Sequence, residues 1–131
     1  MEDFQGRTVF FVDDAAHALR LYVESLGFTQ DWEHRGDGRL LVCQASLFGL
    51  ALILDATHDG ERGRVGHGRV FVGLDDAQRD RLRRHVRERG IATSVVPWGA
   101  PTLVIRDPDG NELFFWGPRG EAWDPDAVPT R

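Results

Sequence analysis

The sequence of 131 residues contains no lysine and only one cysteine, Cys43. Without lysine, the chain cannot form a Schiff base or use a catalytic amine. With one cysteine, it can form neither an intrachain disulfide nor a multi-cysteine metal site. Because Cys43 follows the apolar residues Leu40, Leu41 and Val42, we expect it to be a small buried residue and not a reactive thiol.

Long apolar runs and a basic excess are also absent. The stretch Leu47–Leu54 is far shorter than the ~20 residues of a membrane-spanning helix, and the acidic start Met1–Asp3 is unlike a signal peptide. We therefore expect a cytoplasmic protein with no membrane partner. Sixteen basic and 21 acidic side chains give a net charge of -5, which argues against nucleic acid as a partner and favours a cationic ligand.

The apolar periodicity predicts the order β-α-β-β-β twice within a single domain, 1–131. The first module covers 7–55 and the second 69–117, while 118–131 is expected to be an irregular tail. The pairs Asp13-Asp14 and Asp75-Asp76 each precede a predicted helix and lie 62 residues apart, which indicates an internal duplication.

Two further motifs are the segment Tyr22–Phe28 at the end of the first predicted helix and the turn Asp107–Asn111 before the last predicted strand. Together with the repeated modules, they resemble the vicinal oxygen chelate superfamily over residues 7–117. The resemblance implies an α+β fold in which two βαβββ modules form a cupped mixed sheet with helices on the outside. The superfamily contains metalloenzymes such as glyoxalase I as well as bleomycin resistance proteins.

The resemblance also implies where metal ligands stand in the enzymes of the superfamily, on the first and fourth strands of each module. Here those positions fall at Arg7, Leu52, Arg69 and Phe114, none of which is a usual metal ligand. The only alternative metal site that the sequence offers is displaced along the strands from these positions and would use His67 and Glu112. We therefore predict neither metal nor cofactor and no catalytic residue.

Within the superfamily, the segments Leu26–Trp32 and Pro97–Gly99 are most similar to those of bleomycin resistance proteins. The resemblance implies a groove with Asp31 and Trp32 on one side and Trp98 and Gly99 on the other. Tryptophan faces suit flat rings, and carboxylates, including Asp55, suit a cationic tail. In the alternative interpretation, Trp98 packs in the core and Asp31 caps a turn.

The leading hypothesis is a metal-independent protein that binds and sequesters a small aromatic or cationic antibiotic similar to bleomycin. Such proteins form homodimers, and exposed residues such as Phe48 and Trp116 would seal the interface between the two chains. The alternatives are a metal-dependent enzyme that uses His67 and Glu112, and an interaction module whose cup is filled by side chains. Arg7 and Arg69 would bind an anionic ligand if both face the cup, or else pair with aspartates at its rim.

Overall fold

The computed structural model describes residues 3–57 and 62–117, so the predicted tail lies outside the described residues. The first half contains a strand, a helix that continues into one π-helical turn, and three strands: β1 (Thr8–Phe11), α1 (Ala15–Arg20), η1 (Leu21–Ser25), β2 (Thr29–Gly36), β3 (Arg39–Leu47) and β4 (Leu50–Asp55). After a short 3₁₀ turn, the second half repeats the order: η2 (Arg62–Arg64), β5 (Arg69–Gly73), α2 (Asp76–Arg89), β6 (Ser94–Trp98), β7 (Ala100–Arg106) and β8 (Glu112–Trp116).

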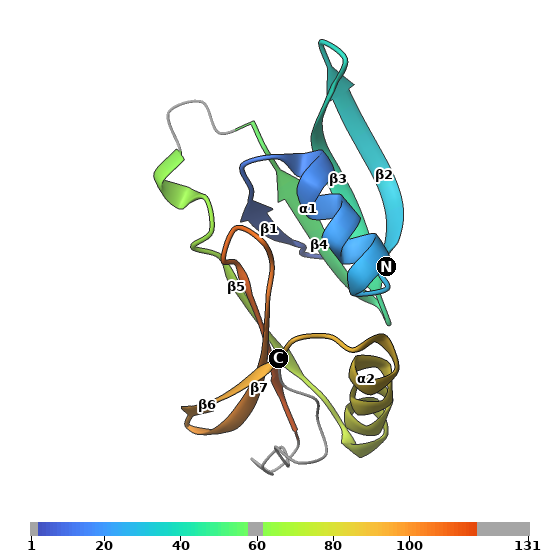
Figure 1. The fold of residues 1–131 in the computed structure, drawn as a ribbon, viewed down its shortest axis with the longest axis vertical. Helices are drawn as coiled ribbons and strands as arrows, with labels where there is room; N and C mark the ends of the chain where they lie inside the picture. Colours follow the sequence, from blue (N-terminus) through green and yellow to red (C-terminus); the bar gives the residue numbers. More distant parts are fainter. Residues whose placement is uncertain (1–2, 58–61, 118–131) are drawn as a thin grey trace.

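The strands form two four-stranded mixed sheets of the same topology, with the orders β1-β4-β3-β2 and β5-β8-β7-β6 (Figure 1). In each sheet the first strand runs parallel to the fourth, and the other neighbours are antiparallel. The α+β class with two similar mixed halves is therefore confirmed.

Both helices begin at a capping aspartate. The side chain of Asp14 accepts from the backbone N–H of His17, while Asp75 forms a reciprocal capping box with Gln78, and each satisfies backbone donors that a helix start leaves without partners. These N-caps lie 61 residues apart, one fewer than the predicted spacing, because the first module has one more residue between its first strand and its helix.

One hydrophobic core joins the two halves. Its members include Tyr22 and Phe10 from the first half and Leu82 and Phe115 from the second, all at most 5% exposed. Because side chains alternate along a strand, every second residue of each sheet faces this core and the residues between them face away from it. We call the surface that faces away from the core the open face of the sheet. The predicted burial of Cys43 is confirmed, and burial raises the pKa of its thiol to about 11.

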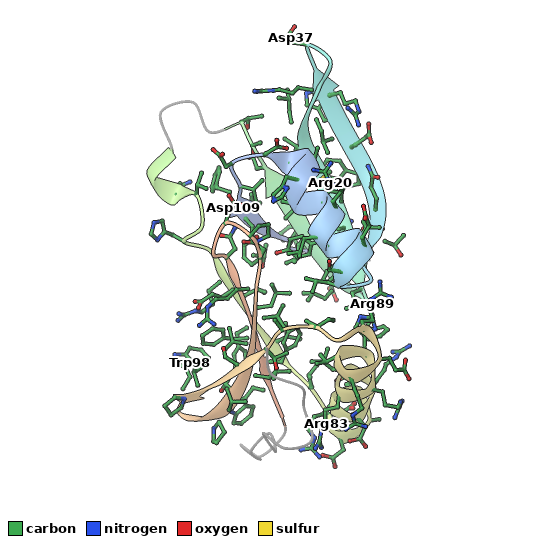
Figure 2. The ribbon with its side chains drawn as sticks, viewed as in Figure 1. Arg20, Asp37, Arg83, Arg89, Trp98 and Asp109 are labelled. Carbon is green, nitrogen blue, oxygen red and sulfur yellow. The ribbon has the colours of Figure 1, made fainter. Side chains whose placement is uncertain are left out.

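The turn between β7 and β8 reaches from the second half into the first (Figure 2, at Asp109). The side-chain amide of Asn111 donates to the carbonyl of Phe11 at 3.0 Å, and its oxygen accepts from the backbone N–H of Gly68 at 2.8 Å. The backbone N–H of Asp13 donates to the carboxylate of Asp109 at 3.1 Å. The Asp107–Asn111 motif therefore serves a structural purpose here, because it ties the start of one module to the end of the other.

No helix within the described ranges has the length and apolar character needed to cross a bilayer.

Candidate functional site

Four aromatic rings gather on the open face of the second sheet, and we call them the aromatic cluster: Phe71, Trp98, Phe114 and Trp116. The ring of Trp98 lies 5.3 Å from that of Phe71 and 5.1 Å from that of Phe114, and Phe71 lies 6.3 Å from Trp116, measured between centroids. Phe114 is buried beneath the others, whereas Phe71 is 48% and Trp98 46% exposed. The cluster therefore offers two ring surfaces to solvent on a packed base.

The position of Trp98 follows from the tight turn that ends β6. Gly99 has a φ of 75°, a conformation that favours glycine, and it allows Trp98 to pair directly with Ala100. Trp98 lies on the side of the second sheet away from α2 (Figure 2). The alternative that Trp98 packs in the hydrophobic core is therefore wrong.

A charged group borders the aromatic cluster. The guanidinium groups of Arg69 and Arg106 each donate to one oxygen of Glu112, at 2.8 and 2.9 Å, and Arg69 also lies 4.2 Å above the ring of Phe114. Partial burial raises the pKa of Glu112, but the hydrogen bonds and charges of the two arginines outweigh it and leave this pKa below its usual value. With two cations and one anion, the border carries a net positive charge.

A polar network occupies the open face of the first sheet, with Gln44 at its centre. The amide oxygen of Gln44 accepts from Arg7 and from the indole N–H of Trp32, both at 3.2 Å, and its amide nitrogen donates to Asp31 at 2.8 Å. The other oxygen of Asp31 accepts from Ser46 at 2.9 Å. The structure thus brings together three predicted site residues through Gln44, which the sequence analysis did not single out.

A β-bulge explains why Asp31 and Trp32 both reach this network. Gln30 pairs with Ala45 and Trp32 with Gln44, so Asp31 has no partner of its own in β3. An extra residue of this kind interrupts the alternation of a strand. Asp31 and Trp32 therefore contact the same face instead of opposite ones, and the alternative that Asp31 caps a turn is wrong.

The remaining predicted residues do not form one site with these. Asp55 ends β4 and accepts from the backbone N–H of Thr57 at 2.7 Å, as in a local turn. Arg7 bonds Gln44 and Arg69 pairs with Glu112, so the expected pairing of these arginines with aspartates is not found in the described residues. A hollow of about 590 Å³ between η1 and the end of α2 is lined by none of the predicted site residues.

The residues at the positions of the metal ligands do not fit a divalent cation. Arg7, Arg69 and Phe114 lie on the open faces, but Leu52 is fully buried in the core, which corrects the expectation that it lines the cup. Because the β1–α1 connection is one residue longer than the β5–α2 connection, the residue of β4 that corresponds to Phe114 of β8 is Ile53 and not Leu52. Guanidinium, alkyl and phenyl groups offer a cation no usable lone pair.

The alternative pair of ligands, His67 and Glu112, fits a metal ion no better. His67 lines a hollow of about 250 Å³ beside β1, whereas both carboxylate oxygens of Glu112 are held by arginines. Among residues 3–57 and 62–117, no three His, Cys, Asp or Glu side chains are grouped so that they would hold a metal ion.

Solved structures with the same fold include binding proteins and an enzyme. An antibiotic binding protein, TnmS3 from Streptomyces sp. CB03234, shares 24% identity over 90% of this chain and 99% of its own, with a TM-score of 0.58. The bleomycin-binding protein of bleomycin-producing Streptomyces verticillus, complexed with copper(II)-bleomycin, shares 18% over 95% and 100%, with a TM-score of 0.57. Lactoylglutathione lyase from Agrobacterium tumefaciens shares 18% over 89% and 95%, with a TM-score of 0.61. At these identities, the likeness concerns the fold alone.

Among curated proteins, none matches the sequence significantly. A family model described as glyoxalase superfamily protein matches residues 5–120, which is most of the chain. Together with the two mixed sheets and the repeated topology, this match shows that the chain belongs to the glyoxalase superfamily.

Proposed function

We propose that this protein binds and sequesters a flat aromatic small molecule of the antibiotic class, without a metal ion, on the open face of its second sheet. The observation that carries the proposal is the exposure of Phe71 and Trp98, which lie in ring contact with each other outside the core. Large exposed aromatic surfaces are unfavourable in water and gain free energy when a planar ligand covers them.

The packing beneath these rings makes them a fixed platform. Phe114 lies edge-on to Trp98 at an interplanar angle of 87°, and the Arg69 guanidinium lies over Phe114. Side chains that are held in place before binding lose little conformational entropy when the ligand arrives. A stacked ligand therefore retains most of the interaction energy of its rings.

The charges suggest which ligand groups suit each sheet. The border of Arg69, Arg106 and Glu112 is net positive, so an anionic or neutral group is favoured beside the aromatic cluster. On the first sheet, the carboxylate of Asp31 is the candidate for a cationic group. The antibiotic binding protein and the bleomycin-binding protein that share this fold support a ligand of this class. We propose that the ligand is captured in the cytoplasm.

We further propose that the protein acts as a homodimer. Exposed apolar side chains such as Val9, which is 42% exposed, would be removed from water by the pairing of two copies. Sedimentation equilibrium is the direct measurement, with a mass of twice 14.8 kDa as the expected result and a monomer at all concentrations as the contradicting one.

The function is tested by titrating EDTA-treated protein with metal-free bleomycin while tryptophan fluorescence is recorded. We expect saturation at about one drug per chain. Phe71→Ala retains all four tryptophans as reporters and should weaken binding about tenfold, which corresponds to a lost stacking contact of about 1.4 kcal/mol. Phe4→Ala is the matched control, because Phe4 is fully exposed.

Two outcomes would contradict the proposal. Unchanged fluorescence up to millimolar drug would exclude bleomycin-like ligands from this face. Equal weakening by Phe71→Ala and Phe4→Ala would show that the aromatic cluster is not the binding surface.

A further inference from the structure

A second cavity lies between the two halves, away from the aromatic cluster. It has a volume of about 260 Å³ and is enclosed by the β3–β4 turn, the end of β5 and the first turns of α2. Its apolar walls come from both modules: Leu47, Leu50, Val72, Leu74, Leu82 and Phe115. A cavity of this size is slightly smaller than those that hold drug-sized ligands, so it suits a smaller apolar group.

The polar side chains at this cavity are hydrogen-bond donors. Arg81 lines it and carries its guanidinium 4.2 Å above the ring of Phe48, and within the described ranges it forms no ion pair. Gln78 also lines the cavity; its amide oxygen accepts from the backbone N–H of Asp75 at 2.8 Å, which leaves its NH₂ group available. No Asp or Glu of the described chain lines the cavity. The charge and the donors therefore complement an anion.

Phe48 adds an independent observation at the same place. With Gly49, whose φ is 85°, it forms the two-residue turn between β3 and β4, and its φ of 49° is the conformation that such a hairpin turn requires. Its ring is held by edge contact with His85, at 5.3 Å between centroids, and by Arg81 above it. The turn thus holds the ring of Phe48 at the mouth of the cavity, beside the guanidinium of Arg81.

We propose that this cavity is a second binding site, for a small apolar carboxylate such as a medium-chain fatty acid. The carboxylate meets Arg81 and Gln78, and the alkyl chain enters the leucine-lined interior. Each methylene buried there contributes about 0.8 kcal/mol, or roughly fourfold in affinity. Affinity should therefore rise from butanoate through hexanoate to octanoate. The site is separate from the aromatic cluster and does not depend on the function proposed above.

The test is a titration of the full chain with octanoate, in which methyl NMR spectra are recorded at each concentration. We expect saturable shifts of the methyl groups of Leu50, Val72 and Leu82, while those of Val104, on the open face of the second sheet, stay unchanged. Arg81→Gln should weaken octanoate binding about tenfold, the effect of losing one charge-assisted hydrogen bond. Arg84→Gln is the matched control, because this exposed arginine of α2 does not line the cavity. Both arginines are exposed, so the variants should fold.

Uncharged 1-octanol separates the role of the carboxylate from that of the chain. It should bind wild type about tenfold more weakly than octanoate and bind Arg81→Gln as it binds wild type. Equal binding of octanol and octanoate would overturn the anion site, as would equal effects of the two arginine variants. Absence of saturable shifts at the cavity, or closure of the cavity by a second copy at NMR concentrations, would overturn the proposal itself. The bleomycin titration is unaffected by any of these outcomes.

Discussion

The hydroxyl of Tyr22 donates a hydrogen bond to the carboxylate of Asp107 at 3.1 Å, across 85 positions of the chain. Tyr22 is fully buried and Asp107 is 6% exposed. The same carboxylate accepts from the backbone N–H of Asp109 and from both nitrogens of Asn111. A buried carboxylate is costly unless its oxygens are bonded, so this arrangement makes the contact between the two modules specific as well as apolar.

Tyr22 should resist ionisation in the folded protein. Burial, and next the negative charge of Asp107, raise the pKa of Tyr22 well above its ordinary value of 10.0. Since the folded protein holds this proton more tightly than the unfolded chain, the stabilisation is complete below about pH 10 and decreases as the pH rises further. Tyr22 is the only tyrosine, so tyrosinate absorbance near 295 nm reports on it alone. Protein unfolded in urea should titrate near pH 10 and native protein only at higher pH; coincident curves would contradict the burial of the hydroxyl.

The close approach of Gly66 to the β7–β8 turn predicts a large difference between two glycine variants. A Cβ at Gly66 would lie 2.0 Å from the backbone oxygen of Asp109, and the φ of Gly66 is 78°. Gly66→Ala should therefore lower the free energy of unfolding by about 3 kcal/mol or more, because the turn must shift as well. Gly63→Ala, where a Cβ meets nothing within 4 Å, is the control and should change it by less than about 1 kcal/mol. Urea denaturation measures both, and similar losses would contradict the contact.

Two rings of the aromatic cluster should differ in their contribution to stability. Phe114 is 3% exposed and Trp98 is 46% exposed. Phe114→Ala should cost about 3–5 kcal/mol of unfolding free energy, as for other buried phenylalanines. Trp98→Ala should cost about 1 kcal/mol and chiefly weaken the binding of aromatic ligands. A larger loss of stability for Trp98→Ala than for Phe114→Ala in urea denaturation would show that Trp98 is a structural residue.

Glu112 should stabilise the fold in a pH-dependent manner. Its pKa in the folded protein is below the ordinary value, so its contribution is present above about pH 4.5 and is lost as the pH falls through the lowered pKa. The paired arginines are about half exposed, and solvent limits the contribution to about 1 kcal/mol. Glu112→Gln should therefore lower stability by about that amount at pH 7 and by less at pH 3. A pH-independent difference in the urea midpoints would exclude the ion pairs as its source.

Local signals predicted much of the fold from the sequence. The capping aspartates and the turn Asp107–Asn111 act over a few residues, and the apolar periods reveal which faces of the helices and strands need a partner. The bonds of Asn111 to Phe11 and Gly68 were beyond such reasoning, because they depend on the packing of the two halves.

The incorrect predictions result from offsets of a single residue along the chain. Asp13 was aligned with Asp75, but Asp14 is the cap of α1, so Leu52 was placed on the wrong face of β4. The bulge at Asp31 likewise breaks a period of two that sequence reasoning assumes. Gln44 left one available signal in the sequence, since it is the first polar residue after the apolar run Leu40–Cys43.

The bulge at Asp31 has an evolutionary consequence. Gln30 and Trp32 of β2 pair with Ala45 and Gln44, which are adjacent in β3. Deletion of the codon for Asp31 would therefore make Gln30 and Trp32 adjacent as well, and the two pairs would follow each other without a bulge. The carboxylate would disappear, while the remainder of β2 kept its neighbours. A lineage can therefore gain or discard the acidic group of this surface through one in-frame deletion or insertion, leaving the cores of both modules untouched.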